Sequence, residues 1–118
     1  MLFRSAEGGS LTVVATAAVD TGAATDELVL EELEGTANAE VRLSRALADA
    51  GLHPAVDLAD TMTRHEDRLL ADDELAAVQR LRRTLAERPD AASSLGLLLE
   101  RVSATRSNAD LLARVTKG

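Results

Sequence analysis

The spacing of apolar positions changes from strand-like to helical along this chain. Ser10 to Val19, SLTVVATAAV, is a continuous run rich in β-branched residues between two turn segments, which predicts a strand buried on both faces. Leu28 to Leu33 fits either a short strand or a helical turn, and its leucine and valine start favours the strand. Strands followed by helical segments predict an α/β fold with a parallel sheet.

A helix, a strand and a loop are predicted to form one structural unit from Gly35 to Arg64. Asn38 is a plausible N-cap of a helix that ends at Gly51, where a left-handed residue would stop it. One face of this helix is apolar at Leu43, Ala46, Leu47 and Ala50. Pro54 prevents the helix from resuming, so Leu52 to Val56 is expected to be a buried, extended strand. The polar loop that follows ends at Arg64.

Three amphipathic helices are predicted after residue 70. Asp72 or Asp73 is predicted to cap the first helix, and Pro89 to stop it, with acids near its start and arginines near its end, as the helix dipole favours. The second has Gly96 in its interior, and Ser107 with Asp110 forms a capping-box-like start for the third. Their apolar faces are Leu75, Val78, Leu81 and Leu85; Leu95, Leu98, Leu99 and Val102; and Leu111, Leu112 and Val115.

Composition narrows the class of protein. The chain has 118 residues, 46% of them hydrophobic, which suits one domain or part of one, with Phe3 as the single aromatic residue. The net charge of -7 offers little general attraction to a nucleic-acid backbone. Cysteine is absent, which excludes disulfides and thiolate metal sites. No run is apolar enough for a membrane span or a signal peptide, so a cytoplasmic protein is expected.

Several stretches resemble a known family. LSRALADAGLHPAVD, followed by a loop that ends in TR, is similar to the late part of the RecA-like ATPase core of hexameric motors. The stretches GGSLTVVATAAVDTG, DELVLEELEGTANAE and TRSNADLL narrow the resemblance to the Rho family of transcription termination factors, over roughly Phe3 to Val115. The resemblance implies the C-terminal portion of a RecA-like P-loop NTPase core over residues 1–70. It implies a helical tail packed on that core over residues 71–118.

The resemblance also implies ATP and Mg²⁺ as cofactors, and ATP-dependent RNA translocation by a hexameric ring. The chain itself has no phosphate-binding loop, because Gly8-Gly9-Ser10 lacks the required lysine and precedes a strand. LTVVATAAVD looks like an apolar strand that ends in a magnesium-binding aspartate, but the resemblance places this run at a later strand. We therefore expect the isolated chain neither to bind ATP and Mg²⁺ nor to hydrolyse ATP.

Arg64 and His53 are the candidates for nucleotide contact. The resemblance implies that Arg64 is an arginine finger, which acts in trans on the phosphates held by a neighbouring subunit, although the loop reads MTR in place of GTR. The alternative is a surface salt bridge within RHEDR. His53 takes the position at which the family stacks an aromatic ring on adenine; the alternative is a partly buried histidine. Gly51 stands where Rho-like chains usually have an arginine.

Thr21 and Gly22 begin the loop that, by resemblance, faces RNA in the central channel. The lysine expected next is missing from Ala23 to Thr25, and Glu34 replaces another lysine, which weakens any phosphate contact. In the LSR motif, Ser44 and Arg45 are expected to serve packing and subunit contact. No metal site is predicted, because Pro54 breaks the helical spacing that would bring His53 and Asp57 together.

Three functions remain open at this point. The first is a piece or divergent relative of Rho that supplies an arginine finger and a subunit interface to a homo-oligomer or to Rho-type subunits, with RNA as an implied partner. The second is a stand-alone interaction or regulatory module of a Rho-type ring, without ATPase activity. The third is a non-functional fragment.

Overall fold

The computed structural model describes residues 2–4 and 8–117, with the backbone alone for residues 2–4. The chain divides into two compact units, Met1–Glu40 and Val41–Gly118. Within the described part of the chain, no helix is both long and apolar enough to cross a membrane. The predicted boundary at residue 70 remains a prediction about the intact domain.

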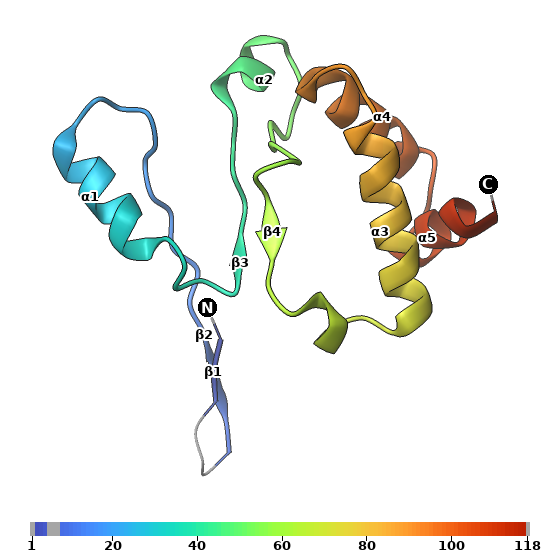
Figure 1. Cartoon of the computed structure of the whole chain (residues 1–118), viewed down its shortest axis with the longest axis horizontal. Coiled ribbons are helices and arrows are strands. Elements are labelled where there is room, and N and C mark those ends of the chain that lie inside the picture. Colours follow the sequence, from blue (N-terminus) through green and yellow to red (C-terminus); the bar gives the residue numbers. More distant parts are fainter. Residues whose placement is uncertain (1, 5–7, 118) are drawn as a thin grey trace. The chain divides into compact units, whose positions relative to one another are not determined.

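The first unit consists of a hairpin, an irregular segment and one helix (Figure 1). Strands β1 (Leu2–Arg4) and β2 (Ser10–Thr12) pair antiparallel, with Phe3 opposite Leu11. The buried strand predicted over Ser10 to Val19 is wrong. The observed strand β2 ends at Thr12. Val14 is 89% exposed, because no described element of this unit covers either face of the predicted run.

The strand predicted over Leu28 to Leu33 is also wrong, because these residues lie in helix α1 (Ala24–Leu33). Local polar chemistry starts this helix. The hydroxyl of Thr21 donates to the carboxylate of Asp26 (2.7 Å), and Asp26 and Glu27 place negative charge in the first turn. Strand β3 (Ala39–Glu40) ends the unit. None of residues 8–40 is buried.

In the second unit, helix α2 (Arg45–Asp49) is shorter than predicted and begins after Ser44 rather than Asn38. The reason lies in the backbone before it, which is held extended. The Asp57 N–H donates to the Arg42 carbonyl (2.8 Å), and the Ser44 N–H donates to the Ala55 carbonyl (2.9 Å). Leu43 and Val56 form an antiparallel bridge, so the predicted strand from Leu52 to Val56 is reduced to one bridge. This bridge and the β1–β2 pair are both antiparallel, which differs from the parallel sheet expected.

Gly51 ends α2 as predicted, with φ +77°. Leu52 N–H donates to the Leu47 carbonyl and Gly51 N–H donates to the Ala48 carbonyl, at 3.0 and 2.9 Å. These two bonds are the Schellman pattern, in which a left-handed residue lets the chain close over the last helical carbonyls. Strand β4 (Met62–Thr63) and a 3₁₀ turn, η1 (Glu66–Arg68), then lead towards the first long helix.

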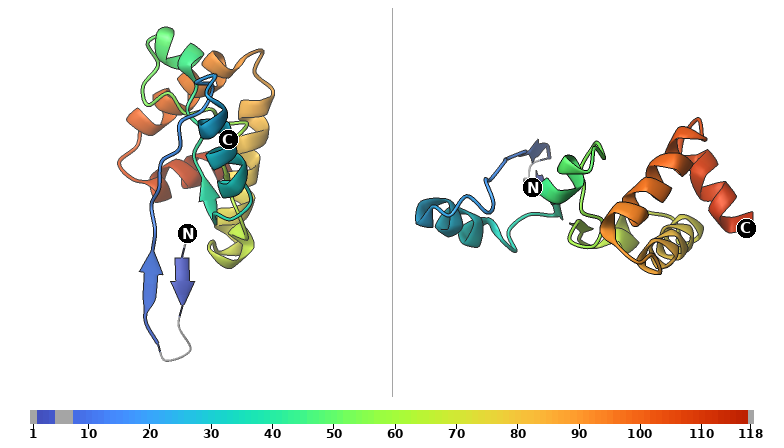
Figure 2. Two further views of the ribbon diagram at one scale, coloured as in Figure 1. Left: turned by 90° about the vertical axis from the view of Figure 1, so that its left-hand side faces the viewer. Right: turned by 90° about the horizontal axis from the view of Figure 1, so that it is seen from above.

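The core lies among the three predicted long helices, which are confirmed as α3 (Asp72–Ala86), α4 (Ala91–Ser103) and α5 (Asn108–Lys117). Helix α3 contacts both α4 and α5 (Figure 2). Its N-cap is Ala71, one residue before the predicted aspartates. Asp90 caps α4, and Ser107 accepts a bond from Asp110 N–H at the start of α5. The central cluster is Leu81, Leu85, Leu111 and Val115.

Candidate functional site

The Arg64 loop is braced on both sides by hydrogen bonds. Before it, Asp57 Oδ1 accepts from the Ala59 and Asp60 N–H groups (3.0 and 3.4 Å), and the Thr61 hydroxyl oxygen accepts from Arg42 N–H (3.1 Å). After it, His65 adopts a left-handed conformation (φ 53°) and its carbonyl accepts from Arg68 N–H (2.9 Å). Local hydrogen bonds therefore hold the backbone on both sides of the arginine.

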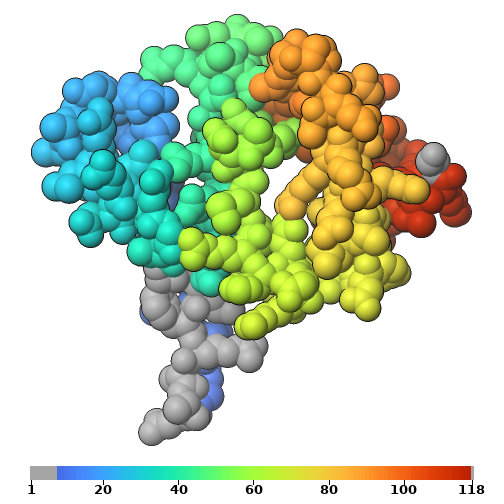
Figure 3. All heavy atoms as spheres, viewed as in Figure 1, coloured from blue at the N-terminus to red at the C-terminus, as the bar shows by residue number. Residues whose placement is uncertain are grey.

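The side chain of Arg64 is exposed. Its closest acidic neighbour along the sequence, Glu66, is bonded to another arginine. Both oxygens of Glu66 accept hydrogen bonds from Arg82 of α3, one of them at 2.7 Å, and η1 lies against α3 (Figure 3). Among the described residues, Arg64 has no hydrogen-bond or ion-pair partner. The guanidinium is thus free to meet a partner molecule.

His53 belongs to the same unit as Arg64 and lies just after the Gly51 turn. It is exposed, not partly buried, and the peptide bond to Pro54 is cis. An exposed imidazole beside a fixed turn offers a flat surface to a ring of another molecule. Among the described residues, no group of three or more histidine and acidic side chains gathers in a way that could hold a metal ion.

Thr21 and Gly22 lie in the other unit, at the start of α1. The Thr21 hydroxyl donates to Asp26 and accepts from Ala23 N–H (3.3 Å), and Gly22 has φ +74°. These contacts start a helix. They also place a carboxylate on the hydroxyl that the RNA hypothesis would need as a donor.

The LSR motif also differs from its predicted packing role. Leu43 is 64% exposed, Ser44 is the N-cap residue of α2 without a side-chain cap bond, and Arg45 is exposed. Leu47, one turn further, is the buried residue of this helix. The motif is therefore largely available at the surface, as a subunit contact would require.

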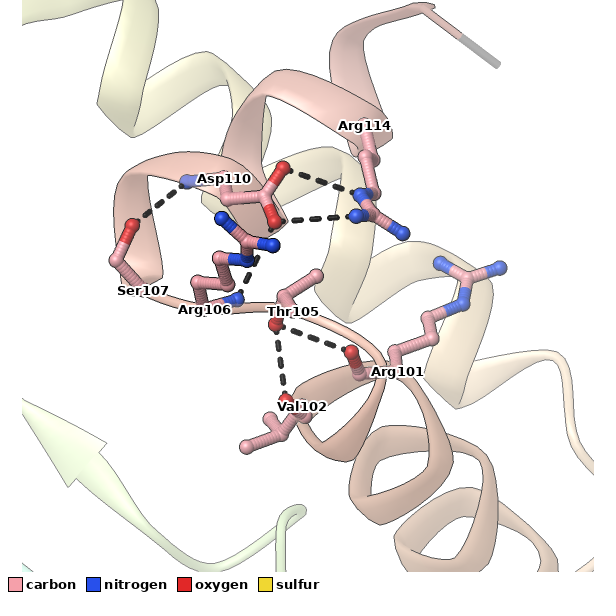
Figure 4. A network of polar contacts seen from close by, with 7 residues as sticks. All are labelled: Arg101, Val102, Thr105, Arg106, Ser107, Asp110 and Arg114. Atoms are coloured by element: carbon pink, nitrogen blue, oxygen red, sulfur yellow. Dashed lines mark hydrogen bonds and ion pairs between the residues drawn. The ribbon is translucent and has the colours of Figure 1, made fainter.

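Sequence reasoning missed a second polar region, which lies where α3, α4 and α5 meet. Arg80, Arg101 and Arg114 line one pocket there. Arg114 donates twice to Asp110, at 3.1 Å for each bond, and Asp110 also accepts from Arg106 N–H (Figure 4). The Arg114 bond and the Arg106 bond lower the pKa of Asp110 below 3.8. Because the three arginines are far apart in sequence, their spacing gives no signal of this cluster.

The comparisons with known proteins agree on one relationship. The chain is 48% identical over 111 residues to a transcription termination factor Rho from Streptomyces lividans, and 44% identical over 106 residues to one from Akkermansia muciniphila. The chain is homologous to a segment of Rho. These alignments cover 94% and 90% of the chain but 16% and 22% of the two Rho proteins.

A third Rho, from Mycobacterium tuberculosis, is 42% identical over 111 residues, or 18% of its length. The Rho relationship predicted from the sequence is therefore confirmed, for a chain that spans about a fifth or less of these relatives. No protein-family model matches the chain.

Proposed function

We propose that this chain supplies an arginine-bearing loop and a contact surface to a Rho-type assembly. The observation that carries the proposal is the state of Arg64: its loop is braced, its side chain is exposed, and Glu66 is paired with Arg82 instead. A guanidinium that has no partner among the described residues is well suited to stabilise charge on a phosphoryl group bound by another subunit.

In this proposal ATP and Mg²⁺ are held by the neighbouring subunit, and the present chain completes the site in trans. Such completion requires a head-to-tail arrangement, in which the surface around Arg64 faces the next subunit. The exposed imidazole of His53 belongs to the same unit and is the candidate contact for the adenine ring. We do not extend the proposal to RNA binding by Thr21, because its hydroxyl already donates to Asp26.

A rescue experiment tests the proposal. A full-length Rho whose own finger arginine is replaced by alanine should lose most of its RNA-stimulated ATPase activity, since such an arginine is worth about 10³–10⁵ in kcat. Adding this chain should raise the ATPase rate of the altered Rho by at least about tenfold. The Arg64→Lys variant of the chain should raise it little, because lysine lacks the planar fork of the guanidinium. Arg68→Lys, four residues away, is the matched control and should rescue normally.

Unmodified Rho provides the second arm. A chain that enters the ring without a phosphate-binding loop of its own should lower the ATPase rate of intact Rho, which is the regulatory alternative. Rescue that is equally strong with Arg64→Lys would refute the finger role. No effect on either Rho at excess chain would refute both the finger role and the regulatory role.

A further inference from the structure

A pocket of about 590 Å³ opens where α3, α4 and α5 meet. Its polar lining includes Arg80 from α3, Arg101 from α4 and Arg114 from α5, and its apolar lining is Ala104, Leu111 and Val115. This volume is within the range of about 300–1,000 Å³ that is typical of small-molecule sites. Neither Arg64 nor His53 lines it, so it is separate from the candidate nucleotide contact.

The three guanidiniums differ in how far they are satisfied. Arg80 Nη1 donates to the carbonyls of Val115 and Thr116 (3.3 and 3.2 Å), which holds its side chain against the end of α5. Arg114 is fixed by its two bonds to Asp110. Arg101, drawn beside this network in Figure 4, has no side-chain partner among the described residues. The side chains of Arg80 and Arg114 are therefore held in place, whereas Arg101 can offer all its N–H groups to a ligand.

The hydroxyls that line the pocket do not supply free donors. Thr84 donates to the Arg80 carbonyl (3.1 Å), and the Thr105 hydroxyl lies within 3.1 Å of the Arg101 and Val102 carbonyls. Recognition of a ligand in this pocket would therefore depend on the guanidinium N–H groups, which match the oxygens of phosphate or carboxylate in pairs.

Charge counting narrows the ligand further. The pocket lining contains three arginines and no acidic residue, and Asp110 is bonded to Arg114 alone of the three. Among the described residues, the guanidiniums of Arg80 and Arg101 therefore have no ion-pair partner, which leaves about two positive charges at the pocket. The negative charge of the chain lies elsewhere: residues 1–40 carry eight acidic residues against Arg4 alone, whereas residues 41–118 carry twelve acidic and twelve basic residues. A phosphate monoester, with a charge of about -1.5 to -2 at pH 7, balances this surplus better than a single carboxylate or a phosphodiester.

We propose that this pocket binds a small phosphate monoester, with the phosphate on Arg101 and Arg114 and an apolar organic group on Leu111 and Val115. Arg80 also lines the pocket, and its side chain is bonded to the end of α5. The ligand is a free small molecule, because the apolar floor and the volume fit one compact organic group.

Calorimetric titration of the full chain with phenyl phosphate tests the proposal. We expect saturable binding at one site. Arg101→Gln should weaken the affinity by about tenfold or more, since losing a hydrogen bond to a charged group has an effect of that size. Arg83→Gln is the matched control, because it removes the same charge from an exposed position of α3 outside the pocket lining. It should change the affinity for phenyl phosphate by less than about twofold, since solvent and salt screen a distant surface charge.

Two further arms separate this site from non-specific binding. Asp110→Asn frees Arg114 and should tighten phenyl phosphate binding several-fold, which a merely structural role of Asp110 would not do. Methyl phenyl phosphate, a monoanionic diester with the same ring, should bind about tenfold more weakly. Equal binding by Arg101→Gln, equal binding of the diester, preferred binding of a short RNA, or no saturable binding would each overturn the proposal.

Discussion

The backbone at Gly51 limits which residues can replace it. It has φ +77°, closes the Schellman turn of α2, and has no heavy atom within 4 Å of the place where a Cβ would stand. The cost of a side chain there is therefore conformational rather than steric. A non-glycine residue in the left-handed region costs about 1–2 kcal/mol. We expect Gly51→Ala and Gly51→Arg, the latter introducing the residue that the resemblance to Rho implies here, to lower the free energy of unfolding by this amount each.

Thermal unfolding followed by circular dichroism measures the effect. For a unit of this size, a loss of 1–2 kcal/mol corresponds to a fall in Tm of roughly 4–16 °C. Gly51→Asn should fall less, since asparagine tolerates the left-handed region. Gly96→Ala is the matched control: Gly96 lies inside α4, also has open space at its Cβ, and should gain about 0.5–1 kcal/mol. If Gly51→Arg melts with the parent chain, or if arginine costs far more than alanine, the conformational explanation is wrong.

Two other predictions concern the helical unit. Leu95 is 2% exposed, so Leu95→Ala should cost about 2–5 kcal/mol in urea unfolding, whereas Val102→Ala, at a position 47% exposed, should cost much less; equal losses would show that burial does not decide the difference. The Ser93 N–H bond lowers the pKa of Asp90 below 3.8, so the ionised cap stabilises the fold above that pH and its contribution is lost as the pH falls through the folded-state pKa. Asp90→Ala should therefore be less stable than the parent at pH 7, and the gap should narrow below about pH 3.8; Asp90→Asn, which keeps a capping oxygen, should show the smaller deficit at pH 7. A gap for Asp90→Ala that stays constant down to pH 2.5 would contradict this assignment.

Local signals predicted the parts of the fold whose cause lies within a few residues. Pro89 follows the end of α3, Ser107 begins α5, and Gly51 ends α2 because each position satisfies or interrupts backbone hydrogen bonds of its own turn. The apolar faces of the three long helices followed from their period. The relationship to Rho also followed from the sequence alone, because the motifs that carry it are continuous stretches of the chain.

The failures share a different cause. The run from Ser10 to Val19 is apolar enough for a buried strand, but burial needs a partner from elsewhere, and none of the described residues of its unit supplies one. The helix starts after Ser44 rather than Asn38 because Arg42 and Ser44 are bonded to Asp57 and Ala55, fifteen and eleven positions further along the chain.

The sequence by itself determined the three long helices, their apolar faces and the relationship to Rho, since those depend on neighbours in the chain. The tertiary structure alone decided which charges meet. Glu66 is bonded to Arg82, sixteen residues further along the chain, and Arg64 has no partner among the residues that the structure describes. Arg80, Arg101 and Arg114 come to one pocket from three helices, because the packing of leucines and valines beneath them fixes where those helices cross.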